Sequence, residues 1–112
     1  MAQARPEIAG IARRYRAKLS EMGVNVREII LFGSYARGVA HEGSDVDFIV
    51  VSDSFSGMNV RERLEVLGVA AARILEPIQA LGYTQEEYSR SDSDIFLGEI
   101  LNSGAVTLLS DN

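Results

Sequence analysis

Two aspartates, Asp45 and Asp47, stand one residue apart at the start of an apolar run, DFIVV, that has the length of a strand. Because side chains alternate across a strand, both carboxylates should point to one face, with their Cα atoms about 7 Å apart. Two bare carboxylates repel each other, so one of them tends to keep its proton. A divalent cation such as Mg²⁺ removes this repulsion and also binds phosphate oxygens, so the pair predicts a metal site for a phosphorylated substrate.

Gly33 and Ser34 directly follow the preceding apolar run, EIILF. The residues SYARG can open a short helix, and the first backbone N–H groups of a helix are free to bind a phosphate. Gly33 lets the backbone approach the anion without a Cβ, Ser34 adds a hydroxyl donor, and Arg37 adds positive charge one turn later. Two neighbouring strand ends would then bind phosphate and metal, and a nucleoside triphosphate with Mg²⁺ satisfies both.

Each of these short motifs is weak evidence when it stands alone, because a Gly-Ser pair is usually a turn and a D-x-D pair is usually solvated. The ten residues that separate the two motifs, set between two apolar strands, make the combination more specific. A Walker A loop is excluded. The stretch GSYARG has the glycine spacing of that loop, but Val39 and Ala40 stand where Lys and Ser or Thr are required.

The elements that would position these residues can be read from the spacing of apolar residues. Helical spacing predicts one helix from about residue 6 that Gly23 ends, and another over 60–75. Continuous apolar runs predict strands over 28–33 and 47–52, each covered on both faces.

Capping residues and prolines mark the ends of the other elements. Asn59 is the expected N-cap of the helix over 60–75, and Pro77 cannot continue that helix. Thr84 followed by Glu87 has the spelling of a capping box. The remaining expected elements are a strand over 78–83, a helix over 84–90, a helix over 95–101 that Asp92 and Asp94 cap and Gly104 closes, and a strand over 105–109.

The predicted order, α-β-α-β-α-β-α-α-β, favours an α/β or α+β fold in which helices pack on a small sheet. A length of 112 residues with 46% apolar content suits one domain over residues 1–112. The absence of cysteine and the presence of one histidine exclude disulfides and argue against a zinc site. No apolar segment has the length of a signal peptide or a membrane span, so we expect a soluble, cytoplasmic protein without a membrane partner.

The net charge of −5 argues against tight binding to a nucleic acid, because that affinity comes mostly from Lys and Arg. Basic residues nevertheless crowd the first helix. They form either a solvated polar face or a docking surface for an acidic partner or a nucleic acid, and association into a homo-oligomer is also open. These residues are Arg5, Arg13, Arg14, Arg16 and Lys18.

The stretch LFGSYARGVAHEGSDVDFIVV, residues 31–51, resembles the signature of the minimal nucleotidyltransferases of the DNA-polymerase-beta-like superfamily. The resemblance runs from about Val26 to the C-terminus, where YTQEEY is also similar to small stand-alone members. It implies a mixed sheet flanked by helices. It also implies transfer of a nucleoside monophosphate from ATP or another nucleoside triphosphate to a hydroxyl, with release of pyrophosphate.

By this resemblance, Gly33 and Ser34 would hold the triphosphate. Asp45 and Asp47 would be the catalytic residues that bind two Mg²⁺ ions. Many small members of the family are antitoxins encoded beside a HEPN-type ribonuclease toxin, and some are proposed to silence the toxin by adding AMP to one of its tyrosines. A HEPN-type toxin is therefore the partner that the resemblance implies.

One position departs from the pattern of the family. The family has a third carboxylate on the next strand, and an ungapped alignment of YTQEEY places Gln79 at that position. An amide cannot accept a proton from an attacking hydroxyl, and it binds a metal less firmly than a carboxylate does. Glu76 is an alternative carboxylate, but alternation along the strand would turn it to the opposite face from Gln79.

Two hypotheses follow from these residues. The first is a Mg²⁺-dependent nucleotidyltransferase that modifies a partner protein. The second is a module that keeps the fold, with or without the nucleotide pocket, and docks to its partner as a non-catalytic antitoxin. Gln79 is the feature that favours the second hypothesis.

Overall fold

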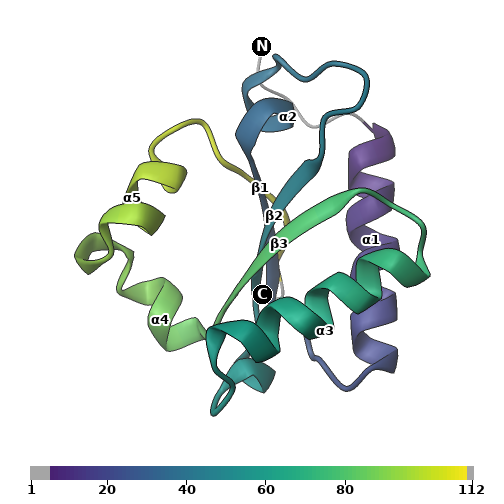
Figure 1. The fold of residues 1–112 in the computed structure, drawn as a ribbon. Helices are drawn as coiled ribbons and strands as arrows, with labels where there is room; N and C mark the ends of the chain where they lie inside the picture. Colours follow the sequence, from purple (N-terminus) through teal and green to yellow (C-terminus); the bar gives the residue numbers. More distant parts are fainter. Residues whose placement is uncertain (1–5, 111–112) are drawn as a thin grey trace.

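The computed structural model describes residues 6–110, whose four strands form one mixed sheet with the order β3-β2-β1-β4 (Figure 1). β1 runs antiparallel to both of its neighbours, β2 and β4, whereas β2 and β3 are parallel. This arrangement confirms the small mixed sheet that the sequence predicted. The strands are β1 (Glu28–Phe32), β2 (Val46–Val51), β3 (Ile78–Tyr83) and β4 (Val106–Ser110).

Helices cover both faces of the sheet, with α1 and α3 on one side and α4 and α5 on the other (Figure 1). None of the helices between residues 6 and 110 is long and apolar enough to cross a membrane. The helices are α1 (Pro6–Glu21), α2 (Gly33–Arg37), α3 (Val60–Arg73), α4 (Gln85–Ser89) and α5 (Ile95–Leu101), and two 3-10 turns that the sequence did not predict are η1 (Asp53–Phe55) and η2 (Ser91–Ser93).

The two central strands, β1 and β2, are buried on both faces, as their continuous apolar runs predicted. Alternate residues of β2 enter two separate clusters. Phe48 packs with α1 and α3, whereas Ile49 and Val51 pack with Leu97 of α5. Asp47 has the same alternation as Ile49 and Val51, so its side chain lies on the α5 side of the sheet.

The predicted N-cap Asn59 and the predicted capping box at Thr84 are both present, and Asn59 also forms a capping box, with Glu62, that was not predicted. The Asn59 side chain accepts a hydrogen bond from the backbone N–H of Glu62, and the Glu62 carboxylate accepts one from the backbone N–H of Asn59, each at 2.8 Å. Thr84 and Glu87 make the same reciprocal pair at the start of α4. These bonds satisfy backbone donors that have no partner inside the helix, which explains why α3 and α4 begin at these residues.

The cap of α5 is only partly as predicted. Asp94 accepts a hydrogen bond from the backbone N–H of Leu97 at 3.0 Å and is the N-cap of this helix. The expectation for Asp92 is wrong, because Asp92 lies inside η2 and the turn places it ahead of the cap position.

The basic residues of α1 use part of their charge within the chain. Arg14 pairs with Glu76 at 2.6 Å, and Lys18 pairs with Glu21 at 2.9 Å. Arg5, which was grouped with them, lies outside the described residues. These pairs reduce the positive charge that α1 presents to a partner.

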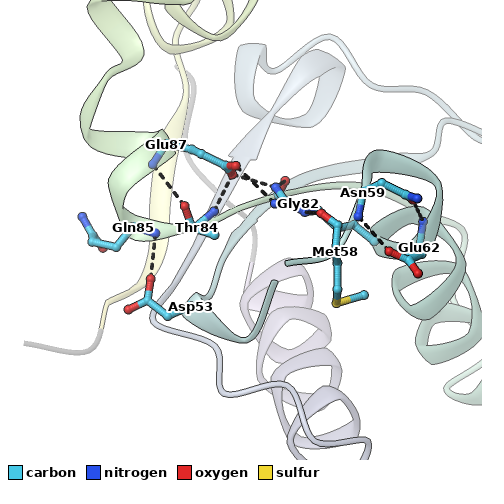
Figure 2. A network of polar contacts seen from close by, with 9 residues as sticks. Asp53, Met58, Asn59, Glu62, Gly82, Thr84, Gln85 and Glu87 are labelled. Atoms are coloured by element: carbon cyan, nitrogen blue, oxygen red, sulfur yellow. Dashed lines mark hydrogen bonds and ion pairs between the residues drawn. The ribbon is translucent and has the colours of Figure 1, made fainter. Parts of the chain in front are cut away.

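A single arginine joins α3 to the end of β3 and to α4. The Arg63 guanidinium donates to both Glu87 oxygens, at 2.6 and 3.2 Å, and to the carbonyls of Gly82 and Met58, at 3.2 and 3.0 Å. It also lies 5.8 Å from the centre of the Phe55 ring. Figure 2 shows Glu87, Gly82 and Met58 converging in this network. A bidentate pair of this kind holds two elements in a defined geometry.

The hydrogen bond from Arg63 is the main reason that the pKa of Glu87 lies below its ordinary value of 4.5. A carboxyl whose pKa is lowered by folding stabilises the folded state above its unfolded pKa, and this contribution is lost as the pH falls through the lowered value. The Glu87 part of the folding free energy is therefore present at neutral pH, begins to decline below about pH 4.5 and is lost as the pH falls through the lowered pKa.

We predict that Arg63→Ala lowers the free energy of unfolding by about 2 kcal/mol, because four hydrogen bonds and a ring contact are lost together. The matched control is Arg61→Ala on the same helix, whose exposed pair with Glu65 should contribute less than about 0.5 kcal/mol. Urea unfolding at pH 7 and pH 4 measures both variants. Equal losses for the two variants would contradict the bracing role of Arg63.

Candidate functional site

The Gly-Ser motif and the acidic pair meet because β1 and β2 are antiparallel neighbours. In the register of this pair, Phe32 at the end of β1 lies opposite Asp47 near the start of β2. Gly33 follows Phe32 directly and begins α2. Two motifs that are ten residues apart in the sequence are therefore adjacent in space, as predicted.

Gly33 is packed directly against the carboxylate of Asp47. Its backbone has φ +75°, a conformation that other residues rarely adopt, and a Cβ added at this position would overlap the Asp47 carboxylate oxygen and lie 3.0 Å from Asp47 Cγ. No side chain caps the start of α2, where Phe32 is the N-cap residue. Glycine is thus required for two independent reasons, and the absence of a Cβ brings bare backbone next to an acid.

The two aspartates differ in their surroundings. Asp45 is exposed and just precedes β2, whereas Asp47 is half-buried within it. Burial raises the pKa of Asp47 above its ordinary value of 3.8, the negative charge of Asp45 raises it further, and the positive charge of Arg37 partly offsets both. The structure therefore brings Asp45, Asp47 and Arg37 together, and Arg37 balances only part of the negative charge of the two aspartates.

Gln79 lies beside the acidic pair, where the ungapped alignment placed it. It is the register partner of Asp47 in the parallel pairing of β2 with β3, and its side-chain amide donates a hydrogen bond to Asp45 Oδ2 at 3.0 Å. Paired residues on neighbouring strands share a face of the sheet, which explains this contact. The third position of the site is therefore an amide in contact with the acids.

Glu76 does not replace the missing carboxylate in this structure. Its side chain pairs with Arg14 of α1 at 2.6 Å, before β3 begins. Between residues 6 and 110, no three His, Cys, Asp or Glu side chains come together in a way that could hold a metal ion. The described site offers two carboxylates and an amide.

Two hollows open beside these residues, one along β3 between α3 and α5 and the other between α2 and α5. The larger, of about 420 Å³, is lined by Asp47 and Gln79, and the smaller, of about 250 Å³, is lined by Gly33 and Arg37. Phe32 of β1 and Phe96 of α5 line both hollows. Ser34 follows Gly33 in α2 and is half-buried. One hollow therefore borders the acids and the other borders the glycine turn and a cation.

The sequence did not single out Phe96 or Glu99, which α5 contributes to the smaller hollow. Residues this far along the chain reach the site only through packing of α5 on the sheet. One signal was available in the sequence. The apolar residues Leu97, Ile100 and Leu101 suffice to cover the buried side of α5, so the core does not require an aromatic residue at position 96.

Comparison with known proteins agrees with this geometry. The family described as "Nucleotidyltransferase domain" matches residues 12–78. A protein of Methanocaldococcus jannaschii named "Putative protein adenylyltransferase MJ1379" is 39% identical over 61 residues, which is 54% of this chain and 60% of that protein. A second protein of that organism, named "Putative protein adenylyltransferase MJ1215", is 46% identical over 44 residues, 39% of this chain and 50% of that protein. The chain thus spans only 50 to 60% of the length of these relatives.

A crystal structure described as "the toxin-antitoxin with AMP-PNP" has a similar fold. Its TM-score is 0.58 at 20% sequence identity, over 88% of this chain and 72% of that one. At this level of identity the likeness establishes the fold, a sheet flanked by helices.

We predict that Gly33→Ala destabilises the protein by more than Gly23→Ala does. Both glycines have a positive φ, so both substitutions carry a backbone cost of about 1 kcal/mol. Only the Cβ at Gly33 meets another group, the Asp47 carboxylate, whereas nothing lies within 4 Å at Gly23. Chemical denaturation of the two variants gives the comparison, and equal losses would show that the contact with Asp47 is not tight.

We predict that Asp47→Asn raises the melting temperature of the metal-free protein at pH 7. Folding raises the pKa of Asp47, so this residue favours the folded state only at low pH, and its contribution is lost as the pH rises through the raised value. The amide removes the burial and repulsion of that charge. Thermal unfolding in EDTA, with the exposed Asp92→Asn as control, tests this, and a lower melting temperature for Asp47→Asn would contradict it.

Proposed function

Because the chain belongs to the nucleotidyltransferase domain family, we propose that it binds ATP or another nucleoside triphosphate with Mg²⁺ and transfers the nucleoside monophosphate to a hydroxyl of a partner protein. The observation that carries this proposal is the contact between the Gly33 turn and the acidic pair. The names of the two Methanocaldococcus relatives, both protein adenylyltransferases in their printed names, support ATP as the nucleotide and a protein as the acceptor.

Asp45 and Asp47 are the residues that would hold Mg²⁺. They fit a cation, because burial and mutual repulsion leave their negative charge only partly balanced by Arg37. When bound, Mg²⁺ supplies positive charge that neutralises the triphosphate. With Gln79 at the third position, the chain offers two carboxylates for the expected pair of ions. The side-chain amide oxygen of Gln79 is the other oxygen beside them that could bind a metal ion.

Gly33, Ser34 and Arg37 would position the triphosphate. The backbone at Gly33 can approach a phosphate because no Cβ intervenes, and the start of α2 carries no side-chain cap. Arg37 borders the same hollow and adds positive charge. In the reaction, the acceptor oxygen forms a bond to the α-phosphorus while the bond to pyrophosphate breaks.

The acceptor hydroxyl must also lose its proton, and Gln79 cannot take it. The proton would pass to solvent or to a group of the partner. The partner that we propose is a HEPN-type ribonuclease toxin, with a tyrosine hydroxyl as the acceptor and this chain as the antitoxin. The structural neighbour described as "the toxin-antitoxin with AMP-PNP" supports this pairing.

A second candidate function is a non-catalytic antitoxin that binds the nucleotide and docks to its partner. The contact between Gln79 and Asp45 favours it, because an amide occupies the place of a carboxylate and uses a hydrogen bond to one of the two acids. Nucleotide binding should survive this change better than transfer does.

The first test is transfer of label from α-labelled ATP, with Mg²⁺, to the protein encoded beside this chain. We expect label on that protein, and we expect Asp47→Asn to remove it because a metal ligand is lost. Inhibition of the partner by both versions alike, without label, would exclude the enzyme and support docking.

The second test uses the departure at Gln79. Gln79→Asp should raise the rate of transfer by about 100-fold, because it adds a proton acceptor and a metal ligand beside Asp47. Gln79→Asn is the matched control, since it has the same size as the aspartate but no charge. Equal rates for the two variants would show that a carboxylate at this position is not what limits transfer.

A further inference from the structure

Phe96 is an aromatic side chain held at the surface beside the site. Its side chain is 57% exposed, although it lies at the second position of α5, next to the buried Leu97. The described part of the chain contains one ring pair, Tyr15 with Phe48, and one cation over a ring, Arg63 over Phe55, and Phe96 takes part in neither. Packing in the hydrophobic core therefore does not explain why an aromatic residue stands at position 96.

The helix that carries Phe96 is fixed by its other residues. Leu97 is fully buried, and Ile100 and Leu101 pack against the same cluster of the sheet. Asp94 caps the first turn of α5 through the backbone N–H of Leu97 at 3.0 Å. The backbone of Phe96 is thus held by the core while its ring stays outside, so a ligand would meet a surface that is already ordered.

The Phe96 ring borders both of the hollows described above. One of them contains Asp47 and the other contains Gly33 and Arg37, so the ring lies next to the acids and next to the glycine turn. Phe32, at the end of β1, also lines both hollows. A ligand with a metal-bound phosphate group at one end and a flat apolar ring at the other could contact the acidic pair and the Phe96 ring at the same time.

We propose that Phe96 is the platform on which the base of the bound nucleotide stacks. This inference rests on the proposed function, because it places the triphosphate at Gly33 and the acidic pair. Every nucleobase has an apolar face that stacks on an aromatic ring, and such stacking tolerates any base because it uses no hydrogen-bonding edge. Phe96 therefore determines affinity for nucleotides over simple polyphosphates, without choosing among bases.

The neighbouring residue provides a matched control. Ile95 is 84% exposed on the same turn of α5 but lines neither hollow. If the apolar start of α5 served only to contact a partner protein, both side chains would matter for that contact and neither would matter for the nucleotide. A base platform requires Phe96 alone.

The experiment is calorimetric titration of the whole chain with two ligands, ATP and inorganic tripolyphosphate, each with Mg²⁺. Phe96→Ala should weaken binding of ATP by roughly 5- to 150-fold and leave tripolyphosphate within about twofold, because only ATP carries a base. GTP should lose affinity as ATP does. Phe96→Tyr should keep the affinity for ATP, and Ile95→Ala should bind both ligands like the wild type.

Different failures point to different errors. If the wild type binds neither ligand, the proposed function fails and the platform fails with it. If the wild type binds both but Phe96→Ala leaves the affinity for ATP within about twofold, or weakens tripolyphosphate equally, the platform alone is overturned. Loss of partner binding by Phe96→Ala and Ile95→Ala alike, with the affinity for ATP unchanged, would assign this surface to the partner protein instead.

Discussion

The contact between Gly33 and the carboxylate of Asp47 is the constraint on which the site depends. It requires a backbone with positive φ and no Cβ at the end of β1, and it requires that β1 and β2 pair in one register. Bare backbone and an acid then lie side by side where the two central strands, β1 and β2, meet. This proximity matters for a ligand that contains both phosphate and a cation. Carboxylates alone would repel the phosphate, and backbone N–H groups alone would not bind the cation.

The same arrangement explains why the change at Gln79 matters. Register with β3 places this residue beside Asp47, at a point where a carboxylate would add negative charge to a pair that already repels itself. The amide instead donates to Asp45 and relieves that repulsion in the absence of a metal. This contact stabilises the ligand-free site but leaves no side chain there that can accept a proton.

The two faces of the sheet divide the work of stability and binding. α1 and α3 cover one face with the larger apolar cluster, whereas α4 and α5 cover the other with a smaller one. Phe96 of α5 lines both hollows, and α3 also lines the larger one through Leu64 and Gly68. Arg63 connects the two sides at the far end of β3, where it pairs with Glu87 of α4. The position of α4 is therefore supported by contacts that lie away from the site.

The helices, the strands and the two motifs could be predicted from the sequence, because apolar periodicity, capping residues and prolines act over a few neighbouring residues. β1 and β2, the N-cap Asn59 and the capping box of Thr84 and Glu87 lie where these local signals predicted. The ion pair of Glu76 with Arg14 and the place of Phe96 beside the hollows could not be predicted in this way. Those contacts join residues distant in the chain, and their positions follow from how the helices pack on the sheet, which no local pattern records.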